Sequence, residues 1–283
     1  MSILNPEKSF SKESNDEIVR VSNLRFSWGE KIVLQDISFS INSGQIVAIL
    51  GKNGAGKTTL IKCLNGIQKP KVGKVEVCSK EISEQSLLEL SKLVSYVPQS
   101  VRTSFPMDVF DVLMLGRRPH VSWRTSPEDL ETVSDTLRQF GLQDLAFRRF
   151  NRLSGGERQR AIIAKAVVQN PRIYLLDEPT SDLDLQHQLL IMEKVTDIIK
   201  NSGGQKSAIF AIHDINMAAR FSDRVILLHE GEILADGTPS KVITQDNIAT
   251  VFGVDSEVTL SSAGSRMNII IGERLKKGDR ENE

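Results

Sequence analysis

The sequence lacks the features that mark several large classes of protein. Across its 283 residues, basic and acidic side chains are equal in number, 36 of each, so the net charge is close to zero. The chain therefore lacks the overall positive field that is typical of nucleic-acid-binding proteins, although a local basic patch is compatible with this balance. No uninterrupted apolar run reaches the length of about 18 residues that a membrane-spanning helix needs. We expect a soluble chain that does not itself cross a membrane.

Cysteine is also scarce, and no leader is apparent. Cys63 and Cys78 lie far apart in apolar segments, which favours a reduced, cytosolic protein with two buried thiols over a disulfide framework. The polar stretch from Met1 to Glu17 has no apolar core of a signal peptide. The length allows one large domain or two modest ones with a substantial core, and there is no internal repeat.

One segment fits the phosphate-binding pattern G-x-x-x-x-G-K-S/T, and it reads Gly51-Lys52-Asn53-Gly54-Ala55-Gly56-Lys57-Thr58-Thr59. An apolar run at 46–50 predicts a buried strand before it, and residues 60–64 have helical spacing after it. In that context the backbone N–H groups and the helix N-terminus can bind phosphate oxygens. Lys57 then reaches the outer phosphates, and the Thr58 hydroxyl can hold Mg²⁺. The alternative is a chance glycine turn, which the flanking strand and helix disfavour.

Apolar strand patterns alternate with helical ones along most of the chain. Strands are predicted at 18–21, 37–41, 46–50, around Val75 and Val77, and at 93–97, 173–176, 208–212 and 225–228. A helix is predicted from Gln186 to Lys200. This order implies an α/β fold with a mainly parallel sheet covered on both faces.

From about residue 100 to 153 the strand signals give way to helical patterns. Ser126 and Pro127 predict an N-cap and a first helical residue. An apolar stripe follows, formed by Leu130, Val133, Leu137 and Phe140. We interpret the segment as a helical insertion into the α/β domain.

Four side chains at predicted strand ends are candidates for chemistry. Asp177 follows the strand at 173–176, where a carboxylate faces the ligand crevice of a parallel sheet and suits a Mg²⁺ shell. Glu178 could orient and deprotonate an attacking water. Gln99 could ligate Mg²⁺ or contact a γ-phosphate, and His213 could bond that phosphate or the water. A plain acidic strand end, and structural roles for the Gln and His, are the alternatives.

Ser154-Gly155-Gly156-Glu157 opens a further predicted helix. Ser-x-x-Glu is a capping box, so an ordinary helix start is the alternative to a functional role. Each glycine so close to the cap costs about 1 kcal/mol. That cost is better explained if backbone N–H groups must approach an anion closely.

Together these pieces resemble the ATP-binding subunit of ABC transporters over about residues 18–240. The most specific part is Leu153-Ser154-Gly155-Gly156-Glu157-Arg158-Gln159, which is similar to the signature motif of that family. The resemblance implies a P-loop NTPase core with an N-terminal antiparallel β part. It also implies the following divisions: a lead-in at 1–16 that we expect to be disordered, an ATPase domain at 17–240 with a helical subdomain at about 100–165, a packed C-terminal extension at 241–275, and a loose tail at 276–283.

The resemblance also assigns roles to matching residues. Glu178, His213 and Gln99 would be catalytic, and Thr58, Gln99 and Asp177 would hold Mg²⁺. ATP would be bound by Gly51, Asn53, Gly54, Ala55, Gly56, Lys57, Thr58, Thr59, Ser154, Gly155, Gly156, Glu157, Gln159 and, in the D-loop, Asp182. Trp28 stands where the family more often has a tyrosine stacked on adenine, and its alternative is a core aromatic beside Phe26.

The implied assembly is a head-to-tail pair of copies, with each ATP between one copy's phosphate loop and the other's signature helix. Shifting the ratio of closed to open pairs from about 1:99 to about 99:1 requires ATP to bind the closed form about 5.5 kcal/mol more strongly than the open form. Residues 100–120 would receive a cytoplasmic loop of a transmembrane permease. This contact would hold the chain at the cytoplasmic face of the membrane, with a substrate-binding protein as an indirect partner and no nucleic acid.

The segment Gly116-Arg117-Arg118-Pro119-His120 is similar to ATPases of importers for iron chelates, haem and cobalamin, as is the more widely shared Leu234-Ala235-Asp236-Gly237-Thr238-Pro239. Ordinary helix and loop packing is the alternative, and the cargo is not encoded in this chain. Three other functions stay open: another importer or an exporter, a soluble ABC ATPase of DNA repair or translation, and a nucleotide-gated module without hydrolysis. Soluble ABC ATPases usually have two ATPase cassettes or a long coiled-coil insertion, and this chain shows neither. The presence of both Glu178 and His213 argues against a module that does not hydrolyse its nucleotide.

Overall fold

A central six-stranded sheet organises the computed structural model, which describes residues 17–100, 106–121, 123–181, 183–260 and 267–275. Its strand order is β10-β9-β3-β8-β7-β6, and every neighbouring pair is parallel except β10 with β9. The predicted α/β class with a mainly parallel sheet is confirmed. The strands are β3 (Ile46–Leu50), β6 (Val94–Val97), β7 (Ile173–Asp177), β8 (Ser207–Ile212), β9 (Arg224–His229) and β10 (Glu232–Gly237).

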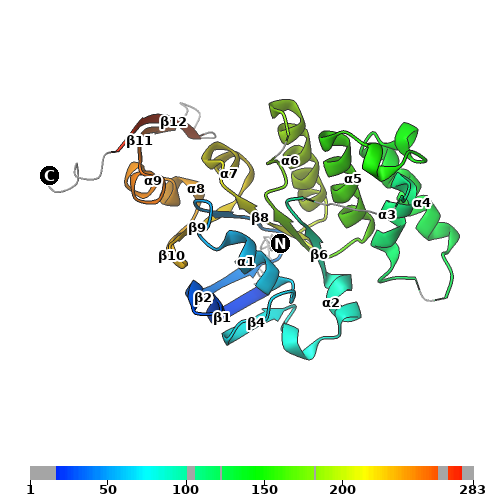
Figure 1. Ribbon diagram of the computed structural model, residues 1–283, viewed down its shortest axis with the longest axis horizontal. Helices are drawn as coiled ribbons and strands as arrows, with labels where there is room; N and C mark the ends of the chain where they lie inside the picture. The colour runs from blue at the N-terminus through cyan, green and yellow to red at the C-terminus, as the bar shows by residue number, and fades with distance from the viewer. Residues whose placement is uncertain (1–16, 101–105, 122, 182, 261–266, 276–283) are drawn as a thin grey trace, which may run out of the picture.

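A second, antiparallel sheet lies beside the central one, at the bottom of Figure 1. Its order is β2-β1-β4-β5, formed by β1 (Glu17–Trp28), β2 (Lys31–Asn42), β4 (Val72–Val77) and β5 (Lys80–Glu81). The first two strands run well beyond the predicted 18–21 and 37–41. Several register shifts between them break the apolar alternation from which their length would be predicted.

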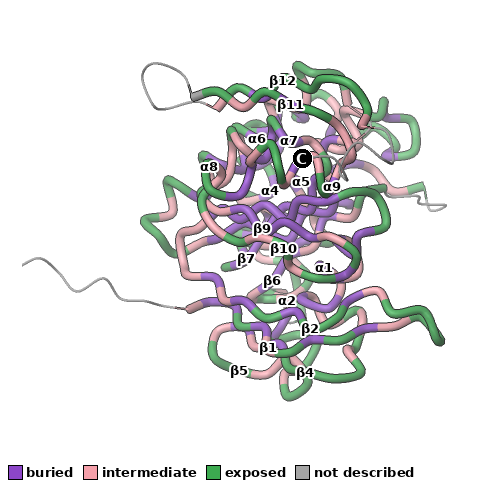
Figure 2. The backbone as a smooth tube through the Cα atoms, turned by 90° about the vertical axis from the view of Figure 1, so that its left-hand side faces the viewer, coloured by how far each residue is buried: buried purple, intermediate pink, exposed green. Residues whose placement is uncertain are grey.

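Two hydrophobic cores lie on opposite faces of the central sheet. Along β3, Ile46, Ala48 and Leu50 belong to one core, and Val47 and Ile49 belong to the other. All five are buried, as the continuous apolar run predicts for a parallel strand covered on both faces. Figure 2 shows the same burial along the neighbouring central strands. Helix α1 (Lys57–Leu64) packs between this sheet and the antiparallel one.

Helices replace strands in the middle of the chain, as predicted. Helices α3 (Val109–Arg117), α4 (Pro127–Gln139) and α5 (Gly155–Val168) pack together at the right of Figure 1. Ser126 caps α4 and Pro127 is its first residue, as expected. Leu130 does not join the buried stripe: it is 44% exposed, and Asp129 takes the buried position in the first turn of α4.

Two further expectations were wrong: that a strand begins at Leu93, and that both cysteine thiols are buried. Leu93 ends helix α2 (Leu87–Leu93), so the strand that follows begins at Val94. Cys63 is buried, and burial raises the pKa of its thiol to about 12. Cys78 is only partly buried, because it lies in the turn between β4 and β5 with a left-handed backbone.

The C-terminal part of the chain adds the last helices and strands of the fold. Among the described helices, none is both long and apolar enough to span a bilayer. Val242, Ile248 and Val251 are buried as predicted, whereas Phe252 is only partly so. The lead-in 1–16 and the tail 276–283 lie outside the described residues, and the domain boundaries stay predictions. The elements not yet named are α6 (Leu185–Lys200), α7 (Ile215–Phe221), α8 (Pro239–Val242), α9 (Gln245–Phe252), the hairpin of β11 (Val254–Leu260) and β12 (Met267–Arg274), and 3₁₀ turns at Ile82–Glu84, Gln143–Leu145 and Phe150–Arg152.

Candidate functional site

The phosphate-binding pattern connects β3 to α1, in the strand–loop–helix context that it requires. Gly56 is the N-cap residue of α1, with φ +104°, a conformation that side chains other than glycine rarely adopt. A Cβ there would also lie 2.6 Å from the Leu34 side chain. The geometry therefore requires glycine at this position, and the first N–H groups of α1 are left available to an anion.

Lys57 is the first residue of α1, and its ammonium is turned into the loop. Only 4% of the residue is exposed, and Nζ donates to the carbonyls of Gly51 (2.9 Å) and Lys52 (3.0 Å). Burial lowers the pKa of Lys57, and the nearby Glu178 carboxylate partly opposes this by favouring the charged form. The phosphate-binding loop therefore encloses the ammonium group of Lys57.

Thr58 and Asp177 form an oxygen pair suited to a hard cation. Thr58 Oγ1 donates to Asp177 Oδ1 over 2.8 Å, and Tyr96 donates its hydroxyl to Oδ2 over 3.3 Å. Asp177 is 1% exposed, and burial raises the pKa of its carboxyl, although the Thr58 hydrogen bond favours the ionised form. Within the described ranges no cluster of three or more His, Cys, Asp or Glu side chains is arranged for a metal. The residues fit a Mg²⁺ that takes few protein ligands and completes its shell with water and phosphate.

Glu178 has the most unusual backbone of the site. Its φ is +47°, uncommon for a residue with a side chain, and its N–H donates to Ala211 O over 2.9 Å. Its carboxylate accepts a hydrogen bond from Gln99 Nε2 (3.0 Å) and lies 3.6 Å from Lys57 Nζ. His213 Nδ1 lies 3.5 Å from the same carboxylate. Gln99, Lys57 and His213, from three separate segments, therefore converge on Glu178.

A hollow of about 380 Å³ lies beside these groups. Its lining includes Trp28 and Lys31, at the end of β1 and the start of β2, together with Asn53, Lys57 and Glu178. Trp28 is 54% exposed, and it meets Phe26 edge-on with ring centroids 5.1 Å apart. The alternative of a core aromatic is therefore wrong for Trp28. Larger hollows lie elsewhere, but this one combines the phosphate-binding loop, the Glu178 carboxylate and an exposed aromatic ring.

The signature residues lie on a different surface. Ser154 caps α5 in a full capping box: Glu157 N donates to Ser154 Oγ (3.3 Å), and Ser154 N donates to Glu157 Oε2 (2.7 Å). Gln159 Nε2 donates to Pro179 O over 3.0 Å, which ties α5 to the loop after β7. None of the predicted signature residues lines the hollow beside Lys57. Their contact with nucleotide, predicted to come from a second copy, stays a prediction, and Asp182 lies outside the described residues.

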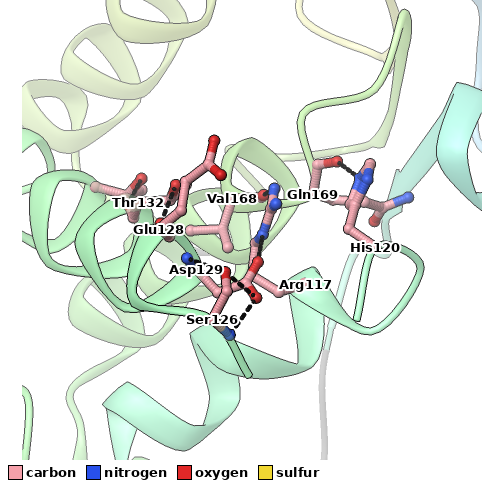
Figure 3. Close-up of polar contacts among 9 residues, drawn as sticks. Arg117, His120, Ser126, Glu128, Asp129, Thr132, Val168 and Gln169 are labelled. Carbon is pink, nitrogen blue, oxygen red and sulfur yellow. Dashed lines mark hydrogen bonds and ion pairs between the residues drawn. The ribbon is translucent and has the colours of Figure 1, made fainter. Parts of the chain in front are cut away.

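The Gly116–His120 segment anchors three helices to one another (Figure 3). A Cβ on Gly116 would lie 2.4 Å from Lys165 O, so α3 crosses α5 at contact distance. Arg117 bridges the Asp129 carboxylate (2.8 Å) and Val168 O (3.0 Å), and His120 Nε2 bonds Gln169 O (2.8 Å). Helix α5 thus ends in contact with the residues that follow α3.

Sequence reasoning missed two of these arrangements. Tyr96 has no motif of its own, and it reaches Asp177 only because β6 pairs with β7 in the observed register. The Arg117–Asp129 ion pair joins two helices, and the capping box of Ser126 and Asp129 was the one local signal available.

Comparison with known proteins identifies the class. The family model described as ABC transporter matches residues 34–181. An uncharacterized ABC transporter ATP-binding protein of Methanocaldococcus jannaschii is 44% identical over 241 residues, covering 85% of this chain and 93% of the relative. The hemin import ATP-binding protein HmuV of Bordetella avium is 34% identical, covering 85% of this chain and 94% of that protein.

A solved structure has the same architecture. A metal-chelate type ABC transporter in an inward-facing conformation matches with a TM-score of 0.77 and 29% identity, covering 90% of this chain and 97% of that one. The chain belongs to the ABC transporter ATP-binding family. It binds ATP and hydrolyses it, as members of this family do.

Proposed function

We propose that this chain is the ATP-hydrolysing subunit of an importer for a metal chelate of the iron–siderophore, haem or cobalamin class. The likeness to a hemin import protein and to a metal-chelate type transporter supports the importer class. The convergence of Lys57, Gln99 and His213 on the Glu178 carboxylate carries the catalytic part of the proposal.

In this proposal Glu178 is the general base. It takes a proton from the water that attacks the γ-phosphorus, the bond from that phosphorus to the β–γ bridging oxygen breaks, and ADP and phosphate leave. Gln99 and His213 orient Glu178 and the water, and Lys57 balances negative charge on the phosphates. Thr58 and Asp177 would hold Mg²⁺, which supplies charge neutralisation on the phosphate oxygens.

Two copies would share each ATP. The hollow beside Lys57 is open, and the capped start of α5 is exposed at Ser154 and Gly155, so one surface can cover the other in a second copy. Ser154 and the N–H groups of Gly155 and Gly156 would then bind the γ-phosphate in trans. A permease would place a cytoplasmic loop against the region of residues 100–120, which includes α3, and this contact would hold the chain at the cytoplasmic face of the membrane.

The test combines turnover with association. The full chain is extracted from native membranes in mild detergent, its companions are identified, and the complex is assayed for ATP hydrolysis with and without the companions' chelate. A polytopic permease together with a chelate-binding protein supports the proposal. A permease with an unrelated cargo makes the chain the ATPase of another ABC transporter, and a chain found only with ribosomes or DNA removes the transport role.

A further inference from the structure

The first turn of α5 begins with two glycines, although it carries the signature residues. Gly155 and Gly156 are its first two residues, and a glycine gives up more backbone freedom in a helix than any other residue. Their N–H groups are among the first four donors of the helix, which have no acceptor within it. A turn built in this way binds an anion well only if neighbouring groups hold it in place beforehand.

His187, in the first turn of α6, packs against Gly156. A Cβ on Gly156 would lie 3.6, 3.7 and 3.8 Å from Cδ2, Cγ and Nε2 of the imidazole, and these are the three atoms nearest to it beyond the adjoining backbone. Such separations are ordinary van der Waals contacts, so the ring supports this face of the turn without crowding it. His187 thus joins the start of α6 to the start of α5, and Figure 1 shows the two helices next to each other.

Asp184 fixes the orientation of this imidazole. As the N-cap residue of α6 it accepts the backbone N–H of His187 over 2.9 Å, and its two oxygens lie 2.8 and 2.9 Å from Nδ1 of the ring. The bond from the His187 backbone, and then the bond from its ring, lower the pKa of Asp184. An ionised carboxylate only accepts, so Nδ1 carries a proton, and the edge formed by Cδ2 and Nε2 is left to contact Gly156.

The segment before α6 is tied to the same helix. Gln188 Nε2 donates to the carbonyls of Thr180 (3.2 Å) and Leu183 (3.0 Å). The backbone that carries Asp184 and His187 is therefore held from both sides. Within this frame the His187 ring is the group that reaches the signature turn.

We propose that His187 is a positioning residue for ATP hydrolysis: oriented by Asp184, its imidazole holds the first turn of α5 where the N–H groups of Gly155 and Gly156 meet the γ-phosphate bound by a second copy. This inference rests on the proposed function and adds a residue to it. His187 does not line the hollow beside Lys57, so it would act on the ATP of the other copy and not on that of its own.

The test separates ATP binding by one copy from the association of two. It uses the Glu178→Gln chain, which should retain bound ATP. ATP affinity is titrated at a chain concentration low enough for a monomer, and the dissociation constant of the dimer is measured by sedimentation in saturating ATP and Mg²⁺. Adding His187→Ala should leave the first value unchanged and raise the second by about tenfold.

Two further variants distinguish the contact with Gly156 from the bond to Asp184. His187→Phe keeps a ring against Gly156 and loses the bond, and it should recover most of the association. His187→Asn keeps an N–H donor for Asp184 but is too short to reach Gly156, so it should behave like His187→Ala. Gln186→Ala, at an exposed residue of the same turn, is the matched control and should change neither value. Urea unfolding checks that each variant is folded.

Each other outcome overturns the inference. An unchanged dimer constant in His187→Ala, or recovery by His187→Asn in place of His187→Phe, removes the positioning role and leaves the proposed shared ATP intact. Weaker ATP binding by the monomer would place the effect of His187 on its own copy. A Glu178→Gln chain that binds ATP and never dimerises removes the proposed pairing and this inference together.

Discussion

The ammonium of Lys57 and the carboxylate of Glu178 lie 3.6 Å apart, joining the phosphate loop to the end of β7. Lys57 is the first residue of α1, and Glu178 holds a left-handed backbone directly after the strand. The group that would bind phosphate and the group that would activate water are thus electrostatically coupled. A triphosphate bound in the loop would compete with Glu178 for Lys57, which would release the carboxylate toward water.

Glu178→Gln should abolish most hydrolysis while ATP still binds. The amide keeps the size of the side chain but cannot accept a proton, and loss of a general base lowers turnover by roughly 10²–10⁴-fold. Steady-state phosphate release and equilibrium ATP binding measure the two effects. Glu230→Gln is a matched control, because Glu230 also has a positive φ (+49°) but lies away from the site in the turn after β9. Unchanged turnover in Glu178→Gln would remove the catalytic assignment.

Trp28→Ala should weaken ATP binding by about tenfold. Stacking of a base on an aromatic ring contributes about 1–3 kcal/mol, and Trp28 offers an open face at the hollow. Trp28→Phe should retain most of the affinity. Trp123, the other tryptophan of the sequence, is 96% exposed and supplies the control Trp123→Ala. Titration with ATP and with a triphosphate lacking the base should separate stacking from phosphate contacts: only ATP should be affected.

Asp177→Asn should stabilise the protein at neutral pH and lower Mg²⁺-dependent turnover by about 100-fold or more. Burial raises the pKa of Asp177 in the folded protein, so ionisation weakens the folded state relative to the unfolded one. This penalty appears as pH rises through the unfolded pKa of about 4 and is absent below it. Thermal unfolding without nucleotide, at neutral pH and near pH 3, should show the gain only at neutral pH. Asp197→Asn, at an exposed carboxylate of α6, should show none.

The Arg117–Asp129 ion pair should matter far more to stability than an exposed pair nearby. Its side chains are 14% and 8% exposed, so removing one partner by Arg117→Met should cost about 3–5 kcal/mol. Arg138→Met, which removes the exposed pair of Arg138 with Asp135, should cost less than about 1 kcal/mol. Urea unfolding measures both, and equal losses would contradict the account.

The same pair predicts a pH dependence. The Ser126 backbone N–H and then Arg117 hold the pKa of Asp129 below its usual range. Its stabilisation is therefore complete above the unfolded pKa of about 4 and is lost as pH falls through the lowered folded value. The stability difference between the wild type and Asp129→Asn should accordingly shrink only in that acid range.

Local signals allowed much of this protein to be predicted, and long-range geometry accounts for what was missed. The loop at 51–59 is contiguous, so its strand, turn and helix could be predicted together. Likewise Ser126 and Ser154 cap the helices they were expected to cap, because each capping box lies within four residues. By contrast, Tyr96 reaches Asp177 only through the register of β6 on β7, which no local pattern encodes.

Backbone irregularity hid other features. The bulged pairing of β1 with β2 shortened the predicted strands, and the seven residues of α7 are too few for a clear helical period. The positive φ of Glu178 also has no signature in its sequence neighbourhood. Such strain is held by surrounding structure, here the bond to Ala211 O and the neighbouring side chains.

The measurement that tests the central claim most directly is the mass of the Glu178→Gln chain in solution, by light scattering, with and without ATP and Mg²⁺. The account predicts a dimer only with nucleotide. It also predicts that adding Ser154→Asp, which keeps a good N-cap but places a negative charge against the other copy's triphosphate, leaves ATP bound to a monomer. A Glu178→Gln chain that binds ATP and stays monomeric, or a dimer that persists with Ser154→Asp, would contradict the claim that ATP joins one copy's phosphate loop to the other's signature helix.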